Sequence, residues 1–99
     1  MSKEEIKPSL RLDKWLWAAR FFKTRSLAQE ALELGRVREN GDRIKPSRQL
    51  RTGELLSVTR GEDTMEVLVT GLSDKRGSAT DAAKLYEETE SSKALRRSR

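Results

Sequence analysis

Apolar residues near the start of the chain recur at the spacing of a helix. Leu12, Leu16 and Ala19 are separated by four and three positions, which places them on one helical face. The pattern predicts a first helix over residues 13–21. Asp13 stands at its start, where a carboxylate can cap the helix or complement its dipole.

A second helix is expected shortly after the first. Thr24 is a candidate N-cap and Ser26 an alternative one, and Gly35 has the position of the glycine that commonly follows a helix end. The buried stripe of this helix is predicted to consist of Leu27, Ala28, Ala31 and Leu34. Arg25 and Gln29, one turn apart, are predicted to lie on the opposite, exposed face.

After this helix the apolar spacing changes to two, which is typical of strands. Residues 36–39 and 42–45 alternate in this way, and the Asn-Gly pair at 40–41 between them is a strong signal for a hairpin turn. A two-residue turn pairs Val37 with Ile44, Arg38 with Arg43, and Arg36 with Lys45. Two like-charged pairs then share one face, and a polyanion lying over that face would relieve their repulsion.

Two further β-rich runs, residues 55–60 and 65–70, predict a second hairpin with a loop between them. The core positions of this region are predicted to be Leu50, Leu56, Val58, Val67 and Val69. Ser78 can cap a last helix over residues 79–88, and the tail over residues 91–99 is expected to be disordered.

Together these elements predict a small single domain of the α+β class. It consists of two antiparallel helices with a short β-hairpin, a second antiparallel hairpin and a C-terminal helix. A chain of 99 residues buries roughly 60–70% of the surface that its unfolded form exposes, which suits one modest core. The expected segments are a flexible arm over 1–9, the main domain over 10–72, a loop and helix over 73–90, and a basic tail over 91–99.

The charge of the chain is concentrated in one stretch. The net charge is +5, and residues 11–48 alone hold ten basic against five acidic residues. Because all the net charge lies in about two-fifths of the chain, a nucleic-acid partner is indicated.

Other classes of function lack the residues that they need. Cysteine and histidine are absent, which removes thiolate nucleophiles, the usual zinc ligands and the commonest general base. We therefore expect no catalytic residue, no metal site and no cofactor, and the chain is not expected to be an enzyme. No apolar run is long enough to span a bilayer, so we expect no membrane partner and a cytoplasmic location.

Three features each allow two interpretations. Lys23 and Arg25 crowd the start of the second helix, where a docked phosphate would offset their cost, or they are simply solvated charges. Asn40 is explained by the positive φ of its turn, and RNA contact is a second possibility. Trp15 and Trp17 are either both core residues, or one of them stacks on nucleic-acid bases.

Several motifs, in this order, resemble the RNA-binding domain named after ribosomal protein S-four, whose αL motif joins two antiparallel helices to a small sheet. The matching pieces are RLDKWLW at 11–17, KTRSLAQEAL at 23–32, GRVRENG at 35–41 and KPSRQLRTGELLSV at 45–58. With LYEET at 85–89, the chain is also similar to a family of small bacterial ribosome-associated heat shock proteins that carry a lone domain of this type. Members usually continue into a basic extension longer than the residues up to Arg99 provide, so the resemblance assigns no role to such an extension here.

The resemblance implies a protein that binds ribosomal RNA on the large ribosomal subunit, including subunits that still carry peptidyl-tRNA, and that assists their rescue or recycling. A monomer is expected. The resemblance and the charge pattern indicate these RNA-binding positions: Arg11, Lys14, Lys23, Thr24, Arg25, Gln29, Arg36, Arg38, Asn40, Arg43, Lys45 and Ser47. The alternative is a small DNA-binding helix-turn-helix protein that reads base edges with Arg25 and Gln29, although Glu30 and Glu33 would oppose insertion into a groove.

Overall fold

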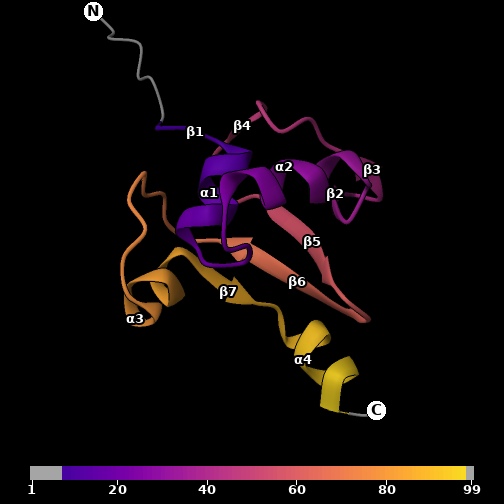
Figure 1. Ribbon diagram of the computed structural model, residues 1–99. Helices are drawn as coiled ribbons and strands as arrows, with labels where there is room; N and C mark the ends of the chain where they lie inside the picture. Colours follow the sequence, from indigo (N-terminus) through magenta and orange to yellow (C-terminus); the bar gives the residue numbers. More distant parts are fainter. Residues whose placement is uncertain (1–7, 98–99) are drawn as a thin grey trace, which may run out of the picture.

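The computed structural model describes residues 8–97 of the chain. Its elements, in chain order, are β1 (Leu10–Arg11), α1 (Leu12–Ala18), α2 (Arg25–Glu33), β2 (Val37–Glu39), β3 (Asp42–Arg43), β4 (Gln49–Leu50), β5 (Leu55–Arg60), β6 (Asp63–Val69), α3 (Ala79–Ala82), the 3₁₀ turn η1 (Ala83–Leu85), β7 (Tyr86–Glu88) and α4 (Glu90–Arg97). Helices α1 and α2 lie together on one side of the main sheet (Figure 1). This arrangement confirms the expected α+β class.

The main sheet has five antiparallel strands in the order β3-β2-β5-β6-β7, and β1 pairs with β4 in a separate two-stranded sheet. In the first hairpin, Arg38 lies opposite Arg43, as the Asn-Gly turn predicts. The other two predicted pairs, Val37 with Ile44 and Arg36 with Lys45, are wrong because β3 ends at Arg43. After β3 the chain turns towards α1, where the carbonyl of Pro46 accepts a hydrogen bond from the start of that helix.

The second hairpin is tighter than its sequence pattern predicts. Strand β6 begins at Asp63, which pairs with Arg60, so the turn contains only Gly61 and Glu62. Strand β5 has its predicted bounds, and β6 begins two residues earlier than predicted, so the ladder between them extends to the pair Arg60–Asp63.

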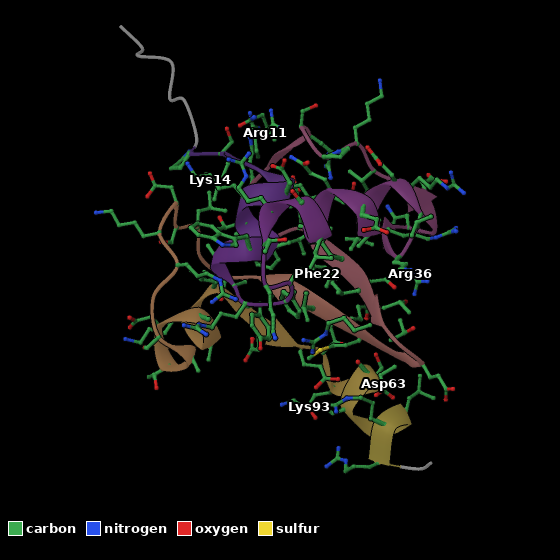
Figure 2. All side chains as sticks on the ribbon, viewed as in Figure 1. Arg11, Lys14, Phe22, Arg36, Asp63 and Lys93 are labelled. Atoms are coloured by element: carbon green, nitrogen blue, oxygen red, sulfur yellow. The ribbon has the colours of Figure 1, made fainter. Side chains whose placement is uncertain are left out.

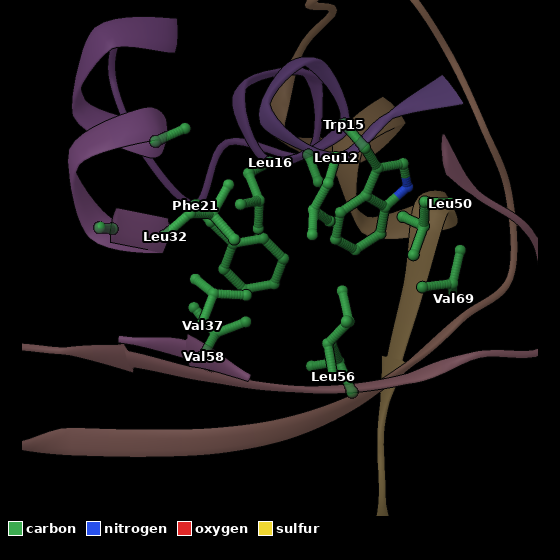
Figure 3. Packing of buried hydrophobic residues seen from close by; sticks show 14 of the residues in the cluster. Leu12, Trp15, Leu16, Phe21, Leu32, Val37, Leu50, Leu56, Val58 and Val69 are labelled. Carbon is green, nitrogen blue, oxygen red and sulfur yellow. The ribbon is translucent and has the colours of Figure 1, made fainter. Parts of the chain in front are cut away.

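Side chains from both layers form a core around the indole of Trp15 (Figure 3). All the predicted core positions of the second half are at most 1% exposed and are confirmed: Leu50, Leu56, Val58, Val67 and Val69. Trp15 is fully buried, and its Nε1 donates to the carbonyl of Gly71 at 2.9 Å, which satisfies its one polar atom. Trp17 is partly buried and packs against the margin of the core.

Both ends of α2 follow the predicted capping chemistry. The Thr24 hydroxyl accepts a hydrogen bond from a backbone N–H of the first turn at 3.0 Å, so Thr24 is the N-cap. Gly35 adopts a φ of 75°, and its N–H bonds to the carbonyl of Leu32. The N–H of Arg36 bonds to the carbonyl of Ala31, which completes a Schellman motif.

The buried face of α2 differs from the predicted stripe. Its buried residues are Ala28, Ala31 and Leu32. Leu27 and Leu34 are 46% and 54% exposed, so the prediction that they are buried is wrong. The helix is turned this way because Gln29 donates a hydrogen bond to Asp13 of α1, which directs the Gln29 side of α2 towards α1.

Helix α1 ends at Ala18, three residues before the predicted end. Arg20 adopts a φ of 65°, and the N–H groups of Arg20 and Phe21 bond to the carbonyls of Trp17 and Leu16. This is again a Schellman motif, here with arginine at the position that glycine usually occupies, and the absence of a glycine hides the helix end in the sequence.

The last predicted helix is divided into two elements. Ser78 caps α3 as predicted, but the helix ends at Ala82 and continues only as the short turn η1. Tyr86–Glu88 are extended and form β7, because they pair with β6 at the edge of the main sheet. The prediction of one helix over residues 79–88 is therefore wrong beyond Ala82.

Helix α4 occupies most of the segment for which the sequence predicts a disordered tail. The Glu88 carboxylate accepts hydrogen bonds from Ser92 and Arg96, and the Ser92 hydroxyl also accepts one from the N–H of Glu66. These contacts hold the helix beside β6 and β7. The predictions for residues 1–7 and 98–99 lie outside the described residues.

The described part of the chain measures 53 × 30 × 28 Å. Its long axis reflects α4, which extends away from the two layers at the end opposite β1 (Figure 1). Within residues 8–97, no helix is both long enough and apolar enough to cross a membrane.

Candidate nucleic-acid interface

The first basic group of the interface is built around a buried carboxylate. Asp13 lies in the first turn of α1 with its side chain fully buried. Arg11 donates to it through Nε at 3.1 Å and through Nη2 at 2.9 Å. From α2, Gln29 donates at 2.8 Å and the Nη2 of Arg25 lies at 3.4 Å. We call these four residues the Asp13 cluster.

The cluster keeps its carboxylate ionised. Burial raises the pKa of Asp13, but hydrogen bonds from Arg11 and Gln29 and the charge of Arg25 outweigh burial and lower the pKa to about 2. The same pairing raises the pKa of Arg11 above its ordinary value, because its guanidinium forms a fork of hydrogen bonds with the carboxylate. At neutral pH the cluster therefore holds two cations and one anion.

The positions of Arg25 and Gln29 in this cluster differ from those predicted for them. Arg25 and Gln29 were expected on an exposed face away from the core, but both turn towards Asp13. An arginine at the start of a helix opposes the helix dipole. Here Arg25 has a structural role that the sequence pattern does not show, since it helps to neutralise a buried anion.

The second basic group lies at the other end of α2. Arg38 donates to the carbonyl of Gly35 at 2.7 Å and to that of Gly41 at 3.0 Å. A Cβ added to Gly35 would meet Arg38 at 2.9 Å and the Nε of Arg43 at 3.0 Å, so both guanidinium groups pack over this glycine. Asn40, with a φ of 53°, forms the turn. We call Arg38, Asn40 and Arg43 the hairpin cluster.

A groove continues from the hairpin cluster along the segment that follows β3. Its volume is about 470 Å³. The residues that line it are Glu39, Asn40, Asp42, Arg43, Ile44, Lys45, Ser47 and Arg48. Backbone hydrogen bonds join this segment to the Asp13 cluster, because Leu12 and Asp13 donate to the carbonyls of Arg48 and Pro46 at 2.9 and 3.1 Å.

Arg48 has a role that the sequence does not reveal. Its guanidinium contacts Glu39 at 2.8 Å and Glu54 at 3.1 Å, so it joins β2 to the turn before β5. Arg48 therefore fixes one wall of the groove and is largely occupied by acids. The sequence analysis also missed the buried role of Asp13, because its partners on α2 are distant in sequence. The signal that could have identified this role is the position of an acid directly beside the apolar stripe of Leu12 and Leu16.

The remaining predicted positions are available at the surface. Within residues 8–97, the structure gives no side-chain hydrogen bond or ion pair to Lys14, Lys23, Arg36 or Lys45. Figure 2 shows Arg11 and Lys14 near the start of α1, with Arg36 displaced towards β2 and β3. Thr24 serves as the α2 cap, and Ser47 lies in the groove. Six of the twelve predicted positions thus belong to the two clusters, and the other six lie beside them.

The outer face of α2 has a different character. Leu27, Glu30, Glu33 and Leu34 are exposed on it. Acidic and leucine side chains are unsuited to reading base edges in a DNA groove, and Arg25 and Gln29 are engaged by Asp13. The geometry therefore gives no support to α2 as a DNA recognition helix.

Comparisons with known proteins agree with this architecture. The family model described as "S4 domain" matches residues 10–56. A heat shock protein 15 homolog of Aeromonas salmonicida is 52% identical over 88 residues, which cover 89% of this chain and 67% of the relative. The RQC P-site tRNA stabilizing factor of Bacillus subtilis is 36% identical over 77 residues, covering 78% of this chain and 88% of the relative.

A solved structure gives the same result for the fold. It is described as the trimeric structure of Vibrio cholerae heat shock protein 15, and it matches with a TM-score of 0.88 and 44% identity over 92% of each chain. The present chain spans about two thirds of the length of the curated heat shock protein 15 relatives. The motifs, the fold and these similarities together show that the chain belongs to the S4-domain family of heat shock protein 15.

Proposed function

We propose that this chain binds ribosomal RNA on the large ribosomal subunit and assists the rescue or recycling of subunits blocked by peptidyl-tRNA. The observation that carries RNA binding is a set of cations beside the two clusters that have no side-chain partner within residues 8–97. Lys23, Arg36 and Lys45 are exposed, and Lys14 is half-buried. Surface cations without internal partners are the groups that can release counterions when they meet phosphates.

The geometry favours recognition of RNA by its shape. The basic groups lie at both ends of α2 and on the first hairpin, so they are spread over several elements rather than gathered on one reading helix. The deep, narrow major groove of A-form RNA does not admit side chains. We therefore expect contacts to the phosphate backbone and 2′-hydroxyl groups of a folded RNA.

The relatives support the ribosomal setting. One of them is named as a factor that stabilises P-site tRNA, which is consistent with action on subunits that still carry peptidyl-tRNA. A related structure is described as trimeric, and this supports an oligomer for the present chain in place of the monomer expected from the sequence.

Salt-dependent binding to large-subunit RNA tests the proposal. Arg36→Gln and Lys45→Gln each remove one exposed charge that has no side-chain partner within residues 8–97, so their effect on folding should be small. Each should weaken binding and reduce the slope of log K against log salt by roughly 0.7–0.9. Lys75→Gln, which removes an exposed charge in the loop before α3, is the matched control and should change neither quantity.

Two outcomes would contradict the proposal. One is an affinity and salt slope that stay unchanged when Arg36→Gln and Lys45→Gln are combined. The other is tighter binding to duplex DNA than to hairpin RNA at one salt concentration, which would favour the DNA-binding alternative.

A further inference from the structure

The Asp13 cluster brings together arginines from two separate elements. Arg11 precedes α1, whereas Arg25 is the first residue of α2. The Nη2 atoms of both arginines contact the same carboxylate oxygen, Oδ2 of Asp13, at 2.9 and 3.4 Å. The two arginine side chains are 44% and 41% exposed, while that of Asp13 is 0% exposed. A fully buried anion thus holds two cations that are open to solvent.

Both arginines keep donors that the cluster does not use. Arg11 spends Nε and Nη2 on the carboxylate, and Arg25 approaches it only through Nη2. The Nε of Arg25 is shielded from solvent and has no hydrogen-bond partner within the described residues, so it is not among the donors that a ligand can reach. A guanidinium presents five N–H donors in a rigid fork, so the remaining ones can serve a ligand.

The pairing of both arginines with Asp13 lowers the free-energy cost of binding a phosphate. Two guanidinium groups held near each other repel, and each long side chain loses rotamer freedom when it is fixed. Asp13 offsets the repulsion and orders both groups before any ligand arrives. The cluster keeps one net positive charge, which suits the negative charge of one backbone phosphate.

We propose that Asp13 is a positioning residue for RNA, which holds Arg11 and Arg25 as a pair whose free donors bind one phosphate. This inference rests on the proposed function. Asp13 itself is covered and does not touch the ligand; it acts through the two arginines.

For Asp13→Asn, the proposal predicts a change in RNA affinity opposite to the one expected from net charge alone. Asp13→Asn raises the net charge by one, which alone would tighten binding to a polyanion. If Asp13 positions the arginines, the same change weakens binding to large-subunit RNA by about tenfold, the equivalent of one charge-assisted hydrogen bond. Glu33→Gln makes the same charge change on the exposed face of α2 and should leave affinity equal or slightly tighter.

A second pair of variants shows whether Asp13 acts through Arg11. Arg11→Gln should weaken RNA binding in the wild-type chain and have little further effect in the Asp13→Asn chain, because residues that act as a unit are not additive. A purely structural role of Asp13 predicts additive losses. Additive losses, or Asp13→Asn binding as tightly as wild type while folded, would overturn the inference.

Asparagine keeps the shape and one acceptor oxygen of aspartate, and circular dichroism verifies the fold. If Asp13→Asn does not fold, Arg25→Lys decides the matter, since it keeps the charge but loses the fork of donors. It should bind RNA as weakly as Arg25→Gln, and wild-type affinity would refute the paired site. If Arg36→Gln loses affinity for RNA while Asp13→Asn and Arg25→Lys do not, this inference alone is rejected. If the wild-type chain does not bind RNA, the proposed function is rejected.

Discussion

The two basic clusters stand at opposite ends of α2 and accommodate like charges by different means. At the N-terminal end, Arg11 and Arg25 share the buried carboxylate of Asp13. At the C-terminal end, Arg38 and Arg43 form no ion pair with an acid in the described part of the chain and lie over Gly35, whose carbonyl accepts a hydrogen bond from Arg38.

The difference follows from the helix dipole. The N-terminal end of a helix carries partial positive charge, so cations there need a counter-ion, whereas the C-terminal end attracts cations through its free carbonyl groups. The Asp13 cluster therefore depends on one buried residue for its stability, and the hairpin cluster depends on none. Removing one side chain should therefore lower the free energy of unfolding much more at the Asp13 cluster than at the hairpin cluster.

The largest expected effect is on the stability of the Asp13→Ala chain. Removing one partner of a buried ion pair costs about 3 kcal/mol, the low end of the usual range, because both arginines retain access to solvent. Arg38→Ala should cost only about 1 kcal/mol, since it loses exposed hydrogen bonds to carbonyls. Urea denaturation measures both, with Glu33→Ala as the control; equal losses at the two clusters would show that the comparison is mistaken.

The next effect concerns acid. The pKa of Asp13 is lowered in the folded state to about 2 from an ordinary value of 3.8, so its carboxylate stabilises the fold above about pH 4 and loses this contribution as the pH falls through 2. The lowering corresponds to roughly 2 kcal/mol. The difference in the free energy of unfolding between wild type and Asp13→Asn should therefore shrink by about that amount between pH 6 and pH 2.

The matching comparison at the hairpin cluster uses Arg38→Gln. Its hydrogen-bond acceptors are backbone carbonyls, which do not titrate. The difference in the free energy of unfolding between wild type and Arg38→Gln should thus stay constant over the same pH range. A constant difference for Asp13→Asn as well would mean that the ion pairs of Asp13 do not stabilise the fold.

Local signals in the sequence predicted much of the framework. Alternating residues such as Leu56 and Val58 identified the second hairpin, and the Asn-Gly turn placed Arg38 opposite Arg43. Thr24 and Gly35 marked the ends of α2, because capping depends on residues within one turn. These features need only neighbours in sequence, which is why a pattern can reveal them.

The missed features depend on partners far along the chain. Asp13 looks like an ordinary first-turn acid until α2 brings Gln29, sixteen residues away, against it. Leu27 and Leu34 fit a helical stripe as well as Ala28 and Leu32 do, and only the contact with α1 decides which face is buried. Tyr86 similarly leaves a helical pattern because β6 offers an unpaired edge.

The smallest expected effect is a gain in stability at the hairpin cluster. Arg43 lies directly opposite Arg38, and like charges in that position destabilise a strand pair, whereas threonine is β-branched and suits a strand. Arg43→Thr should therefore raise the free energy of unfolding by about 0.5 kcal/mol.

The same substitution should weaken binding to large-subunit RNA, because it removes a cation from the groove. Urea denaturation and a salt titration of binding, with Lys75→Gln as the control, measure the two quantities on one sample. Opposite signs would distinguish this cluster from the Asp13 cluster, where stability and binding fall together. If Arg43→Thr instead lowers stability, the packing of Arg43 over Gly35 at the end of α2 outweighs its repulsion from Arg38, and stability and binding would then fall together at both clusters.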